Sequence, residues 1–135
     1  MFKNRLSNIR IVVVDDDADT RILLRFFLEH CGAQPTVASN GPEALELIRK
    51  VRPDLLISDL AMPHMDGYEL MEKVRNLEEE IGSLPSIACY AYARAEDRDR
   101  ARKAGFDAHV EKPVDLDQLV TTILKLVNLP PSLEN

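Results

Sequence analysis

Five short apolar runs, each followed by a stretch of helical periodicity, constrain the fold of this chain more than any other feature. The runs are too apolar for a strand built from them to keep one face in water, which is typical of a parallel sheet covered on both sides. Parallel strands need long crossover connections, and helices provide them. The runs occupy residues 9–14, 35–38, 55–58, 86–89 and 108–111.

Helix signals separate these runs. The first helical stripe closes at Gly32, the segment Asn40-Gly41-Pro42 begins the second helix, and Asp115 caps the last. The third helix is expected to run out in the acidic segment 78–83, and the fourth, at about 96–104, is highly charged. Every predicted strand is thus followed by a predicted helix.

Five strand–helix repeats joined by right-handed crossovers leave few topologies. We predict a single α/β domain with a doubly wound (βα)5 flavodoxin-like fold, in which a parallel five-stranded sheet has the order 2-1-3-4-5 and helices cover both faces. The domain is expected over residues 9–128. Residues 1–8 would form an N-terminal lead-in, and residues 129–135 a C-terminal tail or the start of a linker.

The charge and cysteine content argue against several classes of protein. The chain carries 17 basic and 23 acidic residues, a formal charge of −6 and no dense basic block, so direct binding to nucleic acid is not expected. Its two cysteines lack a metal-type spacing, which favours free thiols in a reducing cytoplasm. No uncharged apolar run approaches the roughly 18 residues of a membrane span. We expect a cytoplasmic protein that does not enter membranes.

Acidic side chains follow two of the predicted strands. Asp15, Asp16 and Asp17 end the first strand, and Asp59 ends the third. These strands are neighbours in the predicted order, and ligands of such sheets bind beyond the carboxyl ends of the strands. Crowded carboxylates repel one another, and a hard divalent cation such as Mg²⁺ relieves that repulsion. The alternative is that residues 15–17 only begin a helix, but Asp59 on the neighbouring strand favours the magnesium site.

Lys112 is a second candidate site residue, because it ends the fifth predicted strand and precedes Pro113. Its flexible ammonium can reach across the rim to Asp59 or to a phosphoryl oxygen. An ordinary surface lysine is the alternative. A cis bond between Lys112 and Pro113 is a further expectation, because X–Pro is the one peptide bond where the cis form costs little.

The ordered set of these motifs resembles the receiver domain of two-component response regulators, the family of the bacterial chemotaxis regulator. The similarity runs from Ile9 to Val127. The matching segments are Val12 to Asp17, Asp59 with Met62-Pro63 and Asp66-Gly67, Ala91-Tyr92-Ala93, and Gly105 to Ala108 leading to Lys112-Pro113-Val114.

The resemblance implies a role for each matched residue. Asp59 would accept a phosphoryl group, and Lys112 would pair with that group. Asp15, Asp16 and Asp59 would hold Mg²⁺ together with the backbone carbonyl of Ala61. The domain would catalyse its own phosphorylation and dephosphorylation, and would not be an enzyme with a separate turnover substrate.

The resemblance also implies the partners. A sensor histidine kinase or a histidine phosphotransfer protein would donate the phosphoryl group. A downstream protein target or an output domain would read the response on the face formed by the fourth helix, the fifth strand and the last helix. A homodimer is compatible with the family.

Two positions depart from the family pattern. The family's Ser or Thr at the end of the fourth strand is Tyr90 here, and its switching aromatic on the fifth strand is His109. A pseudo-receiver that serves as a constitutive interaction module is therefore an alternative function. A third is a magnesium-dependent phosphatase, which usually has an acid two residues after the nucleophile, where this chain has Ala61.

Overall fold

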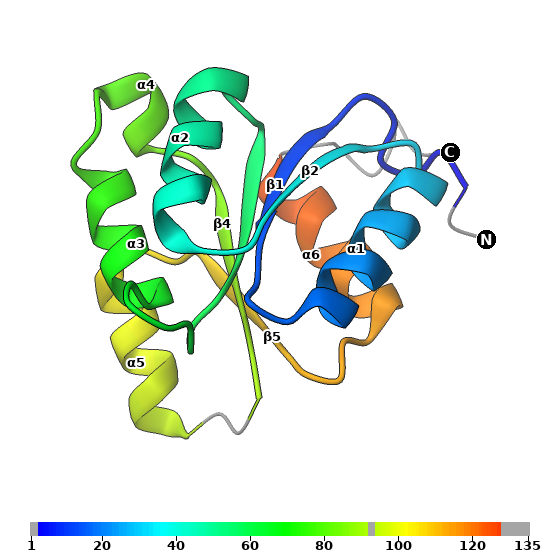
Figure 1. Cartoon of the computed structure of the whole chain (residues 1–135). Helices are drawn as coiled ribbons and strands as arrows, with labels where there is room; N and C mark the ends of the chain where they lie inside the picture. Colours follow the sequence, from blue (N-terminus) through cyan, green and yellow to red (C-terminus); the bar gives the residue numbers. More distant parts are fainter. Residues whose placement is uncertain (1–2, 92–93, 128–135) are drawn as a thin grey trace.

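Strands and helices alternate along most of the chain (Figure 1). The computed structural model describes residues 3–91 and 94–127. The elements are β1 (Arg10–Val14), α1 (Ala18–His30), β2 (Gln34–Ala38), α2 (Gly41–Val51), β3 (Leu55–Asp59), α3 (Gly67–Arg75), α4 (Glu79–Gly82), β4 (Ser86–Tyr90), α5 (Ala95–Ala104), β5 (Ala108–Glu111) and α6 (Leu116–Leu126).

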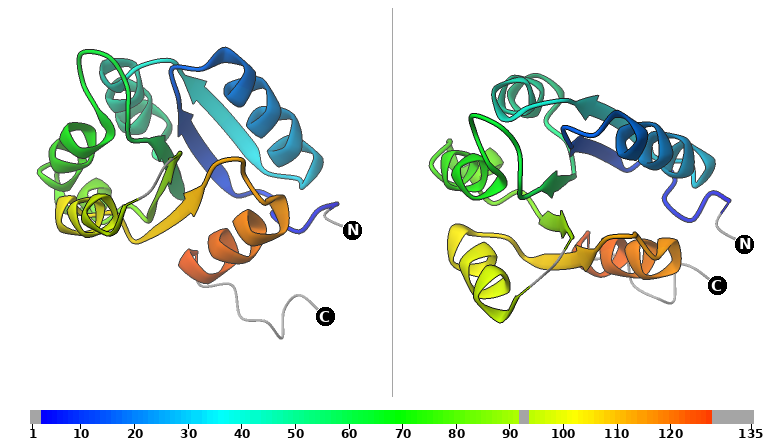
Figure 2. Two further views of the ribbon diagram at one scale, coloured as in Figure 1. Left: turned by 90° about the horizontal axis from the view of Figure 1, so that it is seen from below. Right: turned by 60° about the horizontal axis from the view of Figure 1, so that its bottom comes forward.

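The five strands form one parallel sheet in the order β2-β1-β3-β4-β5, which confirms the predicted topology. Helices α1 and α6 cover one face of the sheet, and α2, α3 and α5 cover the other (Figure 2). Alternate residues of each strand enter opposite cores. Ile11 and Val13 of β1 pack under α1 and α6, whereas Val12 and Val14 pack under the other helices. A sheet with two covered faces explains why its strands are apolar throughout.

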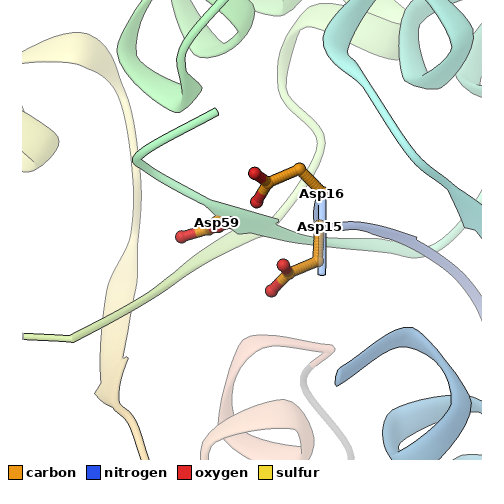
Figure 3. A group of neighbouring side chains, drawn as sticks. All are labelled: Asp15, Asp16 and Asp59. Carbon is orange, nitrogen blue, oxygen red and sulfur yellow. The ribbon is translucent and has the colours of Figure 1, made fainter. Parts of the chain in front are cut away.

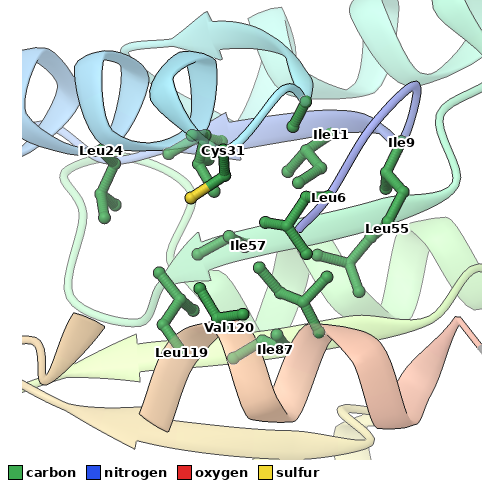
Figure 4. Close-up of a cluster of buried hydrophobic side chains, with 14 of the residues drawn as sticks. Leu6, Ile9, Ile11, Leu24, Cys31, Leu55, Ile57, Ile87, Leu119 and Val120 are labelled. Atoms are coloured by element: carbon green, nitrogen blue, oxygen red, sulfur yellow. The ribbon is translucent and has the colours of Figure 1, made fainter. Parts of the chain in front are cut away.

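The N-terminal segment packs against the domain instead of leading loosely into it. Leu6 is fully buried in the core under α1 and α6 (Figure 4). Its backbone N–H donates to the carbonyl of Cys31 at 2.8 Å, and the N–H of Asn8 donates to that of Gly32 at 3.1 Å. Gly32, which ends α1 as predicted, has a φ of +89° that favours glycine. A domain boundary at residue 9 stays a prediction, and the predicted tail 129–135 lies outside the described residues.

The structure confirms two of the predicted helix caps and adds one short helix that the sequence did not predict. The side chains of Asn40 and Asp115 accept hydrogen bonds from the first turns of α2 and α6, as expected of caps. The acidic segment where the third helix was expected to run out contains the short helix α4, with Ile81 buried at its centre. That apolar contact escaped the sequence pattern because a helix of one turn shows no periodicity. No helix among the described residues is long and apolar enough to cross a membrane.

Arg75, the last residue of α3, joins two connections at the end of the sheet opposite the candidate site. Its Nη1 donates to the carbonyls of Gly82 and Leu84 at 2.8 and 2.7 Å. Its Nη2 donates to the carbonyl of Gly105 at 2.6 Å and to Asp107 Oδ2 at 3.1 Å. One guanidinium therefore fixes both ends of the α4–β4 turn and the α5–β5 turn.

Candidate functional site

Three carboxylates meet at the carboxyl edge of the sheet. Asp59 is the last residue of β3, and Asp15 and Asp16 follow β1, which pairs with β3 through Val14 and Ser58. Figure 3 shows the three side chains gathered at this edge, and one ligand oxygen from each lies within 4.8 Å of the others. Strand pairing thus joins acids that are far apart in the sequence.

The acidic run after β1 divides between two roles. Asp15 is held in place, because its Oδ1 accepts the N–H of Asp17 at 2.9 Å and its backbone carbonyl accepts Arg21 Nη1 at 2.6 Å. Asp17 is the N-cap residue of α1, and its carboxylate accepts the hydroxyl of Thr20 at 2.7 Å. Of the two roles considered for this acidic run, beginning a helix therefore applies to Asp17. The side chains of Asp15 and Asp16 lie with that of Asp59 instead.

Burial and repulsion act together on Asp59. The side chains of Asp15 and Asp59 are almost fully buried, whereas Asp16 is exposed. Burial first, and then the negative charge of Asp15, raise the pKa of Asp59 to about 6, against the opposing effect of Lys112. Three carboxylates gather here, and in the described part of the chain the ammonium of Lys112 is the cation that pairs with them, so the acids outnumber it and negative charge remains. An all-oxygen donor set with surplus negative charge fits a hard divalent cation such as Mg²⁺.

Lys112 faces the same carboxylates from the end of β5. Its Nζ donates to Asp15 Oδ2 at 2.8 Å and lies 3.5 Å from Asp59 Oδ2. Burial lowers the pKa of Lys112, but the hydrogen bond to Asp15 and the charges of Asp15 and Asp59 outweigh it, so the net shift is upward. The peptide bond from Lys112 to Pro113 is cis, as expected. The surface-lysine alternative is therefore wrong.

The loop after β3 is held close to Asp59. The N–H of Leu60 donates to Asp59 Oδ1 at 2.8 Å, and the N–H of Gly67 donates to the carbonyl of Leu60 at 2.8 Å. A Cβ on Gly67 would collide with the carbonyl oxygen of Asp59, so the return of the chain at this point requires glycine. Because this loop folds back against the end of β3, Ala61 lies close to Asp59 on the wall of an open cleft.

This cleft extends from Asp59 and Lys112 towards α3 and α5. Its volume is about 690 Å³, and its walls are mostly apolar. The lining residues are Asp59, Leu60, Ala61, Met62, Asp66, Tyr68, Tyr90, Ala91, Asp97 and Lys112. Sequence reasoning missed Tyr68 and Asp97 because their elements, α3 and α5, meet only after the chain folds. The one available signal was that Tyr68 follows the Asp66-Gly67 motif.

The two positions that depart from the resemblance lie side by side. Tyr90, the last residue of β4, is 4 % exposed, and its ring centroid is 6.0 Å from that of His109 on β5. His109 is exposed. The neighbouring motif residues Tyr92 and Ala93 lie outside the described part of the chain.

The raised pKa of Asp59 predicts a pH-dependent stability in buffer without divalent cations. Well below its ordinary pKa of 3.8 Asp59 is protonated in both states, but between 3.8 and about 6 the folded protein keeps the proton that the unfolded chain has lost. This carboxyl group therefore contributes stability at low pH that is lost as the pH rises through about 6. Urea unfolding at pH 5 and pH 7.5 should show a larger loss for the wild type than for Asp59→Asn.

The control for this pH effect is Glu72→Gln, which removes an exposed carboxylate on α3. That variant should lose as much stability between the two pH values as the wild type. Equal pH dependence in the wild type and Asp59→Asn would contradict the assignment of the effect to Asp59.

Comparison with known proteins identifies relatives over most of the chain. The family model described as response regulator receiver domain matches residues 11–124. An uncharacterized 14.6 kDa protein in the sodA1 3′ region of Leptolyngbya boryana is 52 % identical over 118 residues, which cover 87 % of this chain and 89 % of that protein. Sporulation initiation phosphotransferase F of Bacillus subtilis is 32 % identical over 124 residues, 92 % of this chain and 98 % of that protein.

Solved structures agree with these relatives. The receiver domain of the Francisella response regulator 1452 superposes with a TM-score of 0.81 at 30 % identity, covering 90 % of this chain and 98 % of that one. The chain also matches the sensor histidine kinase RcsC of Escherichia coli at 38 % identity over 87 % of its own length, and there it spans 12 % of the relative.

Proposed function

Because the chain belongs to the response regulator receiver domain family, we propose that it is the phosphoacceptor switch of a two-component or phosphorelay system, with Asp59 as the acceptor. One observation carries the proposal: the carboxylate of Asp59 lies within 4.8 Å of ligand oxygens of Asp15 and Asp16 and 3.5 Å from Lys112 Nζ. An aligned carboxylate, an acidic metal site and a fixed cation are the parts that phosphoryl transfer requires.

The chemistry is a transfer from phosphohistidine on a histidine kinase or a phosphotransfer protein. The bond between phosphorus and a ring nitrogen of the donor breaks, a bond forms between phosphorus and a carboxylate oxygen of Asp59, and the leaving imidazole takes a proton from solvent. Asp59 attacks as the carboxylate, which predominates at neutral pH for a pKa of about 6. Lys112 stays beside the carboxylate oxygens and pairs with the incoming phosphoryl group.

The metal site completes this arrangement. Asp15, Asp16 and Asp59, with the backbone carbonyl of Ala61, would hold Mg²⁺, which when bound neutralises charge on the phosphoryl oxygens. Asp15 is preorganised for this role by its bonds to Asp17 and Arg21. The product is a labile acyl phosphate, so the domain serves as a timed switch and has no separate turnover substrate.

The test is phosphorylation by a small donor. After incubation with Mg²⁺ and acetyl phosphate, the intact mass should rise by one phosphoryl group, and a chelator should prevent the gain. Borohydride reduction converts an aspartyl phosphate to homoserine, so peptide mass spectrometry should then find homoserine at position 59. A protein that binds Mg²⁺ but gains no phosphoryl group would instead be a pseudo-receiver, the constitutive interaction module.

The donor is proposed to dock on α1. Three large apolar side chains of this helix are exposed, Ile22 by 67 %, Leu23 by 50 % and Phe26 by 75 %. The helix begins directly after the acidic run, and Arg21 ties it to Asp15. An apolar helix face beside the acceptor suits a helix of the donor that carries the phosphohistidine. The response would be read by a downstream protein or output domain on a separate surface, formed by α5, β5 and α6.

Phe26→Ser should separate docking from chemistry. We expect transfer from a phosphohistidine protein that phosphorylates the wild type to slow by about tenfold, because exposed aromatic anchors dominate interfaces. Phosphorylation by acetyl phosphate should stay unchanged, since no part of the carboxylate site is altered. Glu29→Ala, at the exposed far end of the same helix, is the matched control and should affect neither reaction. An equal loss with both donors would place the defect in the site instead.

A further inference from the structure

Helix α2 begins with a glycine that the helix itself does not need. Gly41 is the first residue of α2, directly after the N-cap Asn40, and its φ is not in the left-handed region that favours glycine. Within a helix, alanine is more favourable than glycine, because glycine loses more backbone entropy on folding. The reason for a glycine at this position therefore lies in what packs against it.

The side chain of Met65 fills the space that a Cβ on residue 41 would take. A Cβ built on Gly41 would lie 2.5 Å from Met65 Sδ, 2.8 Å from its Cγ and 3.0 Å from its Cβ. Carbon and sulfur atoms that are not bonded do not approach so closely. Because even the Cβ of Met65 is near, a larger residue at position 41 would displace the whole side chain and not only its flexible end.

Met65 lies in the loop 60–66 between β3 and α3, the loop that carries Ala61. The side chain of Ala61 is exposed, so it does not anchor the loop. The first half of the loop is anchored by the buried side chains of Leu60 and Met62, and the second half by Met65, which packs against the same apolar cluster. The N–H of Met65 also donates to the carbonyl two residues earlier at 2.8 Å, so its placement constrains the exposed part of the loop.

The start of α2 is a rigid support for this contact. The N–H of Ser39 donates to Glu43 Oε1 at 2.6 Å, and the N–H of Glu43 donates in turn to Asn40 Oδ1 at 2.9 Å. These reciprocal bonds fix the first turn of the helix. Gly41, between them, is buried.

The same connection between β2 and α2 also contacts the other part of the candidate metal site. The carbonyl of Ala38, the last residue of β2, accepts the N–H of Asp15 at 3.2 Å. Residues 38–41 therefore contact the backbone of one carboxylate residue directly, and through Met65 they contact the loop that carries Ala61.

We propose that Met65 is a positioning residue for the metal ion: packed on Gly41, it holds the loop where the carbonyl of Ala61 would join the three carboxylates around Mg²⁺. A loop that is already fixed does not have to be ordered when the ion binds, so the ion binds more tightly. Glycine at position 41 leaves the space that Met65 needs. This inference rests on the proposed magnesium site, and it assigns a role to a side chain outside the set of proposed ligands.

A double-mutant cycle tests the contact between Gly41 and Met65. Magnesium affinity would be measured on the full chain by an NMR titration of backbone amides, without any phosphoryl donor. We expect Gly41→Ala to weaken magnesium binding by about tenfold, because the added methyl group displaces Met65. Met65→Ala should weaken it by a similar factor. Gly41→Ala added to Met65→Ala should cause no further loss, because the methyl group then has room.

Leu77→Ala is the matched control for a merely structural effect. Leu77 is half-buried, packs against the same apolar cluster as Met65 and lines the same groove between α2 and α3. Its truncation should lower the midpoint of urea unfolding but leave magnesium affinity unchanged. In the Met65→Ala background, Gly41→Ala should instead raise that midpoint, since alanine is the better helix residue.

Phosphorylation by acetyl phosphate gives a second readout. In Gly41→Ala the magnesium concentration that gives half of the maximal rate should rise by about tenfold, as the affinity falls. The rate at saturating magnesium should equal that of the wild type, because Asp59 and Lys112 are unaltered.

The outcomes separate this inference from the proposed function. If the wild type binds no magnesium, the metal site and the role of Met65 both fail. If the wild type binds magnesium and Gly41→Ala binds it equally well, the metal site stands and Met65 does not position it. The same conclusion follows if Gly41→Ala weakens binding equally with and without the Met65 side chain, or if Leu77→Ala weakens it as much. A wild type that binds magnesium but gains no phosphoryl group would overturn only the phosphoacceptor function.

Discussion

Asp59→Asn is expected to abolish phosphoryl uptake from acetyl phosphate, to the detection limit of intact-mass measurement. An amide oxygen is not a nucleophile of useful strength, and neither of the neighbouring acids lies where Asp59 does at the end of β3. The matched control is Asp54→Asn, which alters an exposed carboxylate before the opposite end of the same strand. That variant should gain one phosphoryl group, as the wild type does. Uptake by Asp59→Asn equal to that of the wild type would disprove the assignment.

The same substitution should stabilise the protein in buffer without divalent cations. Burial and repulsion from Asp15 raise the pKa of Asp59 from 3.8 to about 6, so the ionised carboxylate opposes folding at neutral pH. After allowance for solvent screening, we expect the free energy of unfolding to rise by about 1 kcal/mol. Magnesium ions should reduce this difference, because they stabilise the wild-type carboxylate. A variant that is less stable than the wild type at pH 7.5 would contradict the repulsion.

Arg75→Ala should cause a large loss of stability, about 3 to 4 kcal/mol of the free energy of unfolding, because it removes the guanidinium donors from three backbone carbonyls and one carboxylate. The guanidinium is 23 % exposed and joins α3 to the turns before β4 and β5. Arg75→Lys should recover little of the loss, because one ammonium cannot reproduce the forked geometry. Denaturant unfolding followed by circular dichroism provides the measurement.

Arg25→Ala on α1 is the control for this prediction. Arg25 forms an exposed ion pair with Glu29 at 3.8 Å, and such pairs contribute about 1 kcal/mol or less. Arg25→Ala should therefore lower the free energy of unfolding much less than Arg75→Ala does. If the two variants unfold alike, the Arg75 contacts do not stabilise the fold to the extent that their geometry indicates.

Local patterns were sufficient to predict the architecture. The strands at residues 55–58 and 108–111 were predicted within one residue of β3 and β5, because strands with two covered faces must be apolar at every position. The acids at positions 15, 16 and 59 and Lys112 were assigned to one edge for a similar reason: parallel strands place all their carboxyl ends together. Strand order was then enough to bring them side by side.

Features that depend on contacts between distant segments escaped prediction. The burial of Leu6 follows from the space left beside the end of α1, and the one-turn helix α4 follows from the burial of Ile81. Neither leaves a periodic trace in the sequence. The cleft beside Asp59 needs the approach of α3 and α5, which brings together Tyr68 and Asp97.

The sequence alone determined the fold, the acidic edge of the sheet and Lys112 as the basic residue at that edge. Each follows from a local pattern, an apolar strand with polar residues at its carboxyl end, and parallel strands place these ends together. Tertiary structure decided how side chains use the space between elements. It divided the acidic run between the carboxylate cluster around Asp59 and a helix cap, and it buried the Tyr90 hydroxyl without a hydrogen-bond partner among the described residues. The physical reason is that side-chain orientation depends on packing against distant residues, which no stretch of sequence specifies by itself.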